Sequence, residues 1–535
     1  MSIPQTVTEI LRDHVTLEVE SIDRMYLNLY VPKLQYEGGI ASFFRYHRGM
    51  TFASSSLMAP MTEAFVASIK EYAKVNEIPL VHFAKGQRKD DVAAEYLAGF
   101  DQEEGVLFIG VAQEKVSVFR TEKRRNQDTG QTYPWIVRST AVVNQYYIYA
   151  VDRDFGPFFL KFCSYFPYNG RLCLNGHEYA KRQLRQRGIA YEALDNGFRT
   201  CEDPEQLQAI CDGLSAGKID EMLRKWLACV PHPFTPEDRA AGYRYDISIL
   251  QAEFALTQVL DRPLSGRILF EDIIRENLAL GRPDQVQLIF GRRVTKRTPG
   301  RFRTRIITQD VTPSLYVDYK SNRIKQYFKE GRALRTETTI NNTRDFAIGK
   351  RLPNLPDLRQ IGFSANRRLL DVQSLSHDCS IGEDAFQQLN RPVEVNGQRA
   401  AALRYADPTV HALLSLLVMF CLLPNGFRNR DLRGHLAALL GQSPEQMTPG
   451  RMTYHLRRLR LHGLIERIDG THAYRLTQEG IRVAFFFNRT YCRILRPGMA
   501  FIMPDIPDNN STLQQRFHLL DAAIEQLIDR TRLAA

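Results

Sequence analysis

Long apolar runs are missing from this chain of 535 residues. The longest run, ALLSLLVMFCLL at 412–423, ends before Pro424 and is shorter than the roughly 20 residues that a membrane-spanning helix requires. The first residues, MSIPQTVTEILRDH, carry acidic side chains and no apolar core, so we expect no signal peptide. The 8 cysteines form no CxxC pair, which is typical of reduced thiols in a cytoplasmic protein. A secreted, disulfide-linked or integral membrane protein is therefore not expected.

Several enzyme motifs are missing as well. No GxSxG and no GxGxxG occurs, and GLSAGK at 213–218 lacks the spacing of a phosphate-binding loop. His177-Glu178 begins like the zinc-protease motif HExxH, but Lys181 stands where that motif requires its second histidine. The other histidines and cysteines lack the spacing of a zinc site.

The composition is that of a folded protein with a basic surface. Apolar residues make up 44% and aromatic residues 10% of the chain, and 71 basic against 60 acidic residues give a net charge of 71 − 60 = +11. At roughly 150 residues per domain, this length predicts three or four domains. The positive charge favours a polyanionic partner, and nucleic acid, DNA or RNA, is preferred to a membrane surface.

The patterning predicts a multidomain α/β (α+β) architecture. We expect an α/β domain with a mixed sheet over 1–199, a helical domain over 200–290, a basic β-rich segment over 291–405, and a winged helix-turn-helix with C-terminal helices over 406–535. The helices expected in the second domain are 204–214, 218–230, 248–260 and 270–280.

The C-terminal region carries the most specific pattern. Asp407-Pro408 opens a helix, a second helix follows over 429–440, and a third covers 450–464. Asp469-Gly470 is a hairpin turn, and a further helix is expected over 481–495. This order predicts a winged helix-turn-helix. Its segment RRLRLHGLIERIDGTHAYRLTQEG resembles the recognition helix and wing of MarR-like regulators, a likeness that covers about 80 residues and implies duplex binding in a major groove.

The polar face of the third helix is the expected nucleic-acid contact. No acidic residue occurs between Glu445 and Glu466, whereas a merely soluble face usually interleaves acids. Winged helices also act as protein docking modules or RNA binders, and an arginine-rich face can be only solvated, so these alternatives stay open. The residues predicted to contact nucleic acid are Arg451, Tyr454, His455, Arg457, Arg458 and Arg460.

A second basic surface is expected on strands. GRRVTKRTPGRFRTR at 291–305 has seven basic residues and no acidic one. The strand period of two places like charges on one face, and an interleaved tyrosine suits single strands or distorted duplex. The alternative is an exposed outer sheet face on which Glu337 is an ion-pair partner. The predicted contacts are Arg301, Arg303, Arg305, Lys325, Tyr327, Lys329 and Arg335.

Taken end to end, the chain resembles a widespread prokaryotic protein family. The recurring segments that carry this likeness include FVASIKEYAKVNEIPLVHFAKGQRKDD and IKQYFKEGRALRTETTIN. The resemblance implies membership and no mechanism. In the first segment, Arg88 and Lys89 could hold phosphate or simply lie on the surface beside Asp90 and Asp91.

Carboxylates at strand ends are the candidate catalytic and metal-binding groups. Glu114, Asp152 and Asp154 follow an order that parallels the opening of ribonuclease-H-like nucleases, in which clustered carboxylates hold Mg²⁺. Asp152 and Asp154 also suit a hairpin turn, where Asp occurs for backbone reasons. Glu337, among the cations of the basic segment, is the competing catalytic candidate.

These patterns together favour a cytoplasmic nucleic-acid-binding protein. Its catalytic form would be a metal-dependent nuclease or strand-transfer enzyme of a mobile element or defence system. The alternative is a non-enzymatic winged-helix regulator or the protein component of a ribonucleoprotein.

Overall fold

Contacts divide the chain into two compact units. The computed structural model describes residues 7–84, 86–263, 265–266, 269–270, 301–309, 312–329, 331–377, 383–405, 407–421, 423, 426–491, 519 and 522–523. The sheet unit consists of Ile10–Ile274 and Pro299–Arg368, and the C-terminal unit contains Leu369–Ala535. Each unit has helices and strands, so the chain as a whole is α/β with a large mixed sheet.

The strands of the sheet unit form one 11-stranded sheet with the order β10-β11-β12-β13-β9-β1-β6-β5-β4-β3-β2. Only β2 and β3 pair in parallel among the strands described, and the other neighbours are antiparallel. The strands are β1 (Val15–Tyr30), β2 (Leu80–His82), β3 (Gly105–Arg125), β4 (Thr132–Asp152), β5 (Gly156–Cys163), β6 (Gly170–Asn175), β9 (Asp246–Leu260), β10 (Arg301–Gln309), β11 (Thr312–Lys320), β12 (Asn322–Lys329) and β13 (Ala333–Ile340). A separate hairpin pairs β7 (Tyr191–Leu194) with β8 (Gly197–Cys201).

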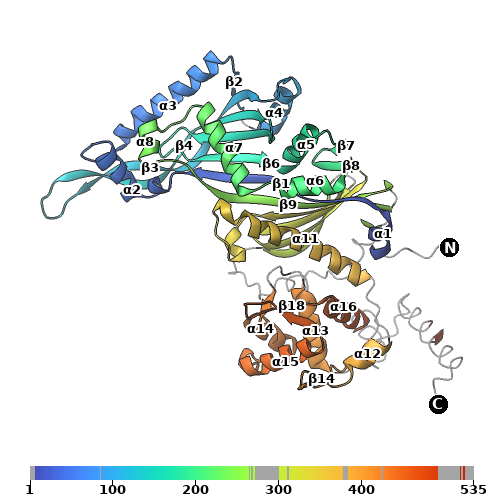
Figure 1. Ribbon diagram of the computed structural model, residues 1–535. Coiled ribbons are helices and arrows are strands. Elements are labelled where there is room, and N and C mark those ends of the chain that lie inside the picture. Colours follow the sequence, from blue (N-terminus) through green and yellow to red (C-terminus); the bar gives the residue numbers. More distant parts are fainter. Residues whose placement is uncertain are drawn as a thin grey trace, which may run out of the picture. The chain divides into compact units, whose positions relative to one another are not determined.

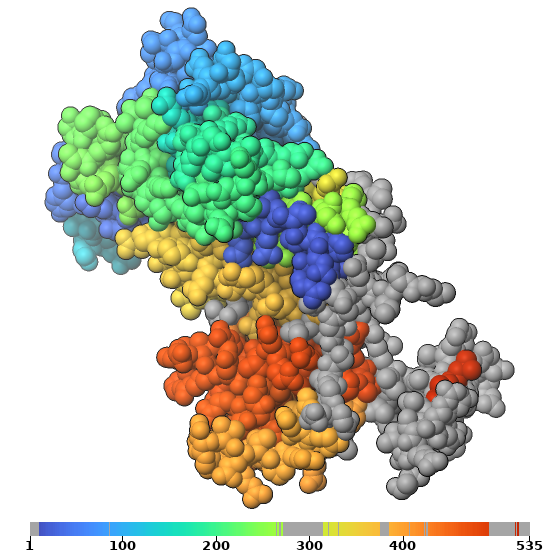
Figure 2. Space-filling model, turned by 45° about the vertical axis from the view of Figure 1, so that its right-hand side comes forward, coloured from blue at the N-terminus to red at the C-terminus, as the bar shows by residue number. Residues whose placement is uncertain are grey.

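Most helices of this unit pack on one face of the sheet. A single apolar cluster joins Phe65, Leu184, Leu223 and Leu358 of four helices to the strand residue Leu27. Figure 1 shows α5, α6 and α7 lying over the strands, and in Figure 2 this green layer forms a continuous surface. The helices of the unit are α1 (Val7–His14), α2 (Glu37–Ser42), α3 (Ser55–Val75), α4 (Lys89–Ala98), α5 (Gly176–Gln186), α6 (Pro204–Asp212), α7 (Ala216–Cys229), α8 (Pro236–Ala240) and α11 (Leu355–His377), of which α11 continues into the C-terminal unit.

The opposite sheet face is mostly polar. There α4 contributes Val92 to a smaller apolar cluster with Phe108, Tyr147 and Tyr149. Most other side chains on this face are charged, hydroxylic or aromatic, and many are half-buried. The predicted catalytic residues Glu114 and Glu337 both lie on this face.

The expected helical domain is wrong in one segment. Residues 204–214 and 218–230 contain the expected helices α6 and α7, but 248–260 lies in β9, in the middle of the sheet. The apolar residues of this segment, at 249–250, 252, 254–256 and 259–260, have a spacing that also suits a helix, so periodicity alone does not distinguish the two. The helix expected over 270–280 lies outside the described residues.

The basic β-rich segment does not form a separate body. Strands β10–β13 continue the sheet of the N-terminal residues through β9, and the same compact unit holds both. The domain boundary expected near 199 therefore falls inside the sheet unit, and the boundary expected near 290 lies outside the described residues. Composition indicated a domain boundary near 199, but strands on either side of it pair in one sheet.

The C-terminal unit contains the expected order of helices and hairpin. Its three-stranded sheet has the order β16-β18-β17. The turn between β17 and β18 closes through the Thr471 N–H, which donates to the Ile468 carbonyl (3.1 Å) around Asp469 and Gly470. The elements are α12 (Glu383–Leu389), β14 (Val393–Val395), β15 (Gln398–Ala400), α13 (Pro408–Phe420), β16 (Phe427–Arg428), α14 (Asn429–Leu439), α15 (Pro449–Leu461), β17 (Ile465–Arg467), β18 (Ala473–Leu476) and α16 (Gln478–Thr490).

No helix among the described residues has both the length and the apolar character needed to cross a membrane.

We predict that Gly480→Ala unfolds the C-terminal unit selectively. A Cβ at Gly480 would lie 1.8 Å from the Leu464 carbonyl oxygen, so the start of α16 would have to move, at a cost of about 3 kcal/mol. Gly434 on α14 is the matched control, because its Cβ would meet nothing within 4 Å and alanine should stabilise the helix by about 0.5–1 kcal/mol. Limited proteolysis should cleave Gly480→Ala within 383–491 and spare the sheet unit. Equal resistance of the two variants would contradict the packing described.

Candidate nucleic-acid interface

The guanidinium of Arg335 lies at the centre of a buried polar network in the sheet unit. This residue on β13 is 0% exposed. Its Nη2 donates to Asp23 Oδ2 on β1 (2.5 Å), its Nε donates to Glu337, and its Nη1 donates to the carbonyl of Asn196. His177 at the start of α5 completes the group, with its Nε2 2.8 Å from Asp23 Oδ1. Arg335 therefore joins two strands, one helix and the β7–β8 hairpin.

The electrostatics of this network follow from burial and pairing. Burial alone would raise the pKa of Asp23, but its bonds to His177 and Arg335 hold that pKa well below the ordinary value. Burial lowers the pKa of His177. Burial and the charges of Asp23 and Glu337 raise the pKa of Glu253, on the neighbouring β9, to about 7.

Two predicted site residues are therefore internal partners. Arg335, predicted to contact nucleic acid, is enclosed and cannot reach a polymer without unfolding. Glu337, the competing catalytic candidate, accepts from Arg335 Nε and from the Tyr327 hydroxyl (2.9 Å). A carboxylate held by a buried guanidinium is an ion-pair partner, which is the alternative that the sequence left open.

The remaining residues of the basic segment differ in accessibility. The register places Lys325 opposite Glu337 and Tyr327 opposite Arg335, so these residues share a face, as predicted. Lys325 Nζ lies 4.0 Å from the Tyr327 ring centroid, and both side chains are half-buried. Lys329 Nζ lies 3.9 Å from an Asp195 carboxylate oxygen, and its side chain is largely buried.

Arg301, Arg303 and Arg305 lie on β10, the outermost strand of the sheet. The ladder pairs Arg305 with Tyr316, and Tyr316 with Lys325. The backbone of the three arginines forms a strand, as predicted. Their side chains lie outside the described residues, so the predicted phosphate contacts stay a prediction.

A second network surrounds Glu114 on β3. Lys89 Nζ donates to Glu114 Oε1 (2.9 Å) and to the Tyr147 hydroxyl (2.6 Å), while Lys161 Nζ donates to Glu114 Oε2. Burial would raise the pKa of Glu114, but Lys161, Tyr147 and Lys89 lower it to about 2. Lys89 therefore neutralises the half-buried carboxylate of Glu114, and this ion pair replaces the predicted contact with phosphate. The side chain of the neighbouring Arg88 is 78% exposed, and its Nε lies 3.9 Å from Asp91 Oδ1.

The predicted carboxylate cluster does not form. Asp152 Oδ2 accepts from Trp226 Nε1 (2.8 Å) of α7, which covers the apolar sheet face, whereas Glu114 lies on the polar face. Asp152 Oδ1 accepts the N–H groups of Asp154 (2.8 Å) and Phe155 (3.0 Å), as expected of the turn alternative.

The expectation of Mg²⁺ rested on Glu114, Asp152 and Asp154 meeting. A sheet separates Glu114 from Asp152, and among the described residues no group of three His, Cys, Asp or Glu could hold a metal ion. These three residues are therefore not the predicted metal site, nor the catalytic group that would use it.

Helix α15 divides its predicted contacts into two groups. Arg451, Tyr454, Arg457 and Arg460 are exposed, and Tyr454 is 48% exposed. Spaced by three residues, they follow one another along the solvent side of the helix. No described carboxylate pairs with Arg457 or Arg460.

The other two contacts predicted on α15 are wrong. Arg458 is 7% exposed, and its Nε donates to the Ala401 carbonyl (3.1 Å) while its Nη2 donates to that of Ala402. His455 is also buried, and burial lowers its pKa. The Arg458 bonds hold α15 against 401–402 of its unit.

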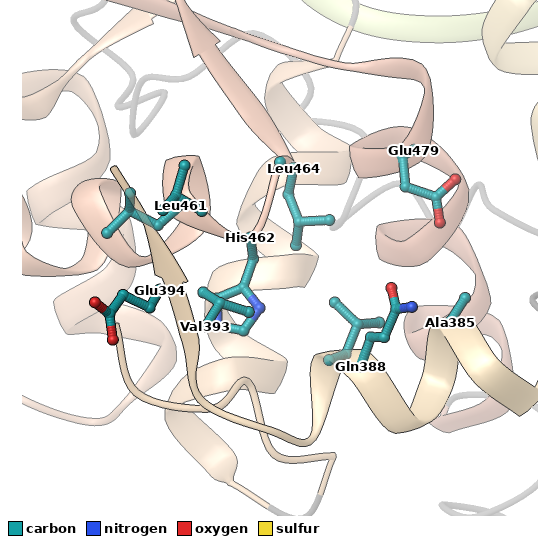
Figure 3. Close-up of a pocket in the computed structure, with 11 residues that line it drawn as sticks. Ala385, Gln388, Val393, Glu394, Leu461, His462, Leu464 and Glu479 are labelled. Carbon is teal, nitrogen blue, oxygen red and sulfur yellow. The ribbon is translucent and has the colours of Figure 1, made fainter. Parts of the chain in front are cut away.

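A groove of about 440 Å³ lies between α12, β14, the end of α15 and α16 of the same unit. Figure 3 shows His462 within this groove and the carboxylates of Glu394 and Glu479 toward its two sides. His462 Nε2 lies 3.0 Å from the Ala401 carbonyl, and burial lowers its pKa. Apart from Gln388 and these two glutamates the lining is apolar, and among the described interactions His462 bonds to a backbone carbonyl and to neither carboxylate, so the groove shows no hydrogen-bonded acid–base pair.

Asp23, His177 and Glu253 are the chemically notable residues that sequence patterns did not find. Asp23 and Glu253 lie within strands and His177 lies at the start of a helix, and each has other polar residues near it in the sequence, so no local pattern sets it apart. Comparisons of the chain with protein-family models, with curated proteins and with solved structures find no match. The functional inference therefore rests on the residues themselves, and the exposed basic stripe of α15 is the feature that carries it.

We predict that Arg335→Met destabilises the sheet unit by about 3–5 kcal/mol, because it leaves Asp23 and Glu337 buried without their cation. Lys325→Met, one strand away and half-buried, should cost less than about 1 kcal/mol. Urea denaturation of both variants measures the difference. A stable Arg335→Met protein that had lost only nucleic-acid binding would show that Arg335 contacts the polymer after all.

A pH dependence follows from Glu253. Its pKa in the folded protein, about 7, exceeds the ordinary 4.5, so the folded state binds this proton more tightly and stability falls as pH rises from about 4.5 to about 7. Glu253→Gln should match the wild type near pH 4 and be more stable by about 1–3 kcal/mol at pH 8. Urea denaturation at both pH values tests this, with the exposed Glu63→Gln as control. A constant difference between Glu253→Gln and wild type across pH would refute the assignment.

Proposed function

We propose that this protein binds nucleic acid and that its C-terminal unit is a winged helix-turn-helix whose α15 contacts duplex. The observation that carries the proposal is the exposed stripe of Arg451, Tyr454, Arg457 and Arg460. Residues 451 and 460 are separated by nine helical steps, or about 14 Å, which is comparable to the width of a major groove. Helix α15 contains no acidic residue that would neutralise the stripe.

The neighbouring elements hold the helix in a defined orientation. Asn429 Nδ2, at the start of α14, donates to the Pro449 carbonyl (3.0 Å) and to Thr453 Oγ1 (2.9 Å). These bonds fix the start of α15 against α14. On the other side, Arg458 ties α15 to the backbone after β15. A rigid helix binds with less loss of conformational entropy than a mobile one.

The β17–β18 hairpin supplies a second contact. Arg467 Nε donates to the Thr471 carbonyl (2.8 Å), and its Nη2 lies 3.0 Å from His472 Nδ1. Arg467 and His472 are therefore held at the tip of the hairpin. In a winged helix, this position lies beside the phosphate backbone when the third helix is in the groove.

We predict that Arg457→Ala combined with Arg460→Ala weakens duplex binding and makes it less dependent on salt. Loss of two phosphate contacts should reduce the slope of log Kd against log salt by about 2. Arg391→Ala combined with Arg399→Ala is the matched control, since it removes the same charge from exposed sites of the same unit. Fluorescence anisotropy with the full chain and a labelled duplex of 20 base pairs, chosen as the probe, measures both.

Circular dichroism should show that both double variants are folded. If the α15 variant kept the wild-type affinity and slope, the C-terminal unit would be assigned as a protein docking module. Arg458 is not used in this test, because its burial would confuse loss of binding with loss of structure.

A further inference from the structure

The hairpin of β3 and β4 extends beyond the core of the sheet unit. The two strands pair from Gly105 with Val151 to Arg125 with Thr132. Phe119 and Ile136 are the last buried apolar residues along the ladder. From 120 to 135 every side chain is exposed or half-exposed, and Figure 1 shows this ribbon projecting beyond α2. Residues 120–138 are named the arm.

The arm carries exposed aromatic rings beside basic side chains. Trp135 is 42% and Tyr133 is 40% exposed. The register places Trp135 opposite Glu122 and Tyr133 opposite Arg124, so all four point to one face. The Arg124 guanidinium lies 5.1 Å from the Trp135 ring centroid, and the two aromatic rings meet edge to face at 6.3 Å.

The charge of the arm is unbalanced. It contains five basic and two acidic residues, giving 5 − 2 = +3. Arg120 pairs with Glu122 (3.0 Å), but no described carboxylate pairs with Lys123, Arg124 or Arg125. Three adjacent cations at the end of a ribbon repel one another unless an anion lies beside them.

The same residues argue against another protein strand as the partner. Among the strands that the structure describes, none pairs with the outer edges of the arm, because β2 pairs with 109–111 of β3 and β5 pairs with 145–152 of β4. Consecutive cations and Pro134 are features that block strand addition at such edges. A two-stranded ribbon without a core is only marginally stable in water, so the arm gains most from a partner that neutralises charge and covers rings.

We propose that the arm binds single-stranded nucleic acid, with Lys123, Arg124 and Arg125 contacting phosphates and with Trp135 and Tyr133 stacking on unpaired bases. Stacking on an aromatic ring contributes about 1–3 kcal/mol per base and tolerates any sequence. This site goes beyond the duplex contact of α15. It lies on the other compact unit and can succeed or fail independently of it.

Tryptophan fluorescence reports on this site with little background. The chain has only two tryptophans, and the second, Trp226, is buried against Asp152. Titration of the full chain with a 20-residue oligo(dT), chosen as probe, should quench Trp135. Trp135→Phe should keep most of the affinity and lose the quenching. An unquenched wild type, or equal quenching in Trp135→Phe, would overturn the stacking assignment.

A charge variant tests the phosphate contacts. Lys123→Gln with Arg124→Gln and Arg125→Gln should reduce the salt slope for oligo(dT) by about 2 and weaken binding at least tenfold. The matched control, Lys70→Gln with Lys74→Gln and Arg244→Gln, removes equal charge from exposed sites of the same unit and should change neither.

Testing each variant with both the duplex and oligo(dT) distinguishes the two sites. Arg457→Ala with Arg460→Ala should keep quenching by oligo(dT), whereas the arm variant should keep duplex binding by α15. If duplex but not oligo(dT) quenched Trp135, the arm would be a duplex contact and the proposal of unpaired bases would be wrong. If the arm and control variants bound oligo(dT) equally, the arm would not be a binding site.

Discussion

The buried guanidinium of Arg335 is the interaction on which the sheet unit depends. It connects residue 23 on β1, residue 196 in the β7–β8 hairpin and residue 337 on β13, which are far apart in sequence. A buried charge is tolerated only when its partners surround it. The network therefore requires the N-terminal strands, the β7–β8 hairpin and the basic β-segment to fold together. This requirement explains why the expected separate domains form one body.

The internal networks also decide where positive charge remains available. Arg335 forms ion pairs with Asp23 and Glu337, and both Lys89 and Lys161 form ion pairs with Glu114. These cations of the polar face are therefore neutralised from within, whereas Lys325 on the same face has the Tyr327 ring and no described carboxylate beside it. Other basic side chains without a described carboxylate partner lie at exposed positions on α15 and on the arm. A polyanion is attracted to those surfaces, because charges already paired contribute little to the outer field.

Local signals in the sequence were sufficient for the helices α13–α16 of the C-terminal unit, but not for α12, β14 and β15. Caps, prolines and a stripe of apolar residues predicted its helices, and Met452, Leu456 and Leu459 are buried as expected. The burial of His455 follows from its position within that stripe, but its polarity suggested exposure. The burial of Arg458 depends on the carbonyls of Ala401 and Ala402, and helical periodicity holds no information about them.

Long-range pairing was the part that the sequence did not reveal. The spacing within 248–260 suits a helix, and only the neighbours β1 and β13 make it a strand. Asp152 ends its strand, as expected, whereas Glu114, also expected at a strand end, lies in the middle of β3. The two side chains lie on opposite faces because of the register of the paired strands β3 and β4. The arm was missed as well, because the polar residues at 113–125 carry no strong strand pattern of their own and pair only through the ladder with β4.

Ultraviolet cross-linking of the full chain to a duplex with a single-stranded tail, followed by mass spectrometry of the linked peptides, tests the central claim most directly. Peripheral binding predicts links in the peptides that contain 451–460 and 123–135. Links concentrated in the peptides of β12 and β13, around Tyr327 and Arg335, with none on α15, would contradict it.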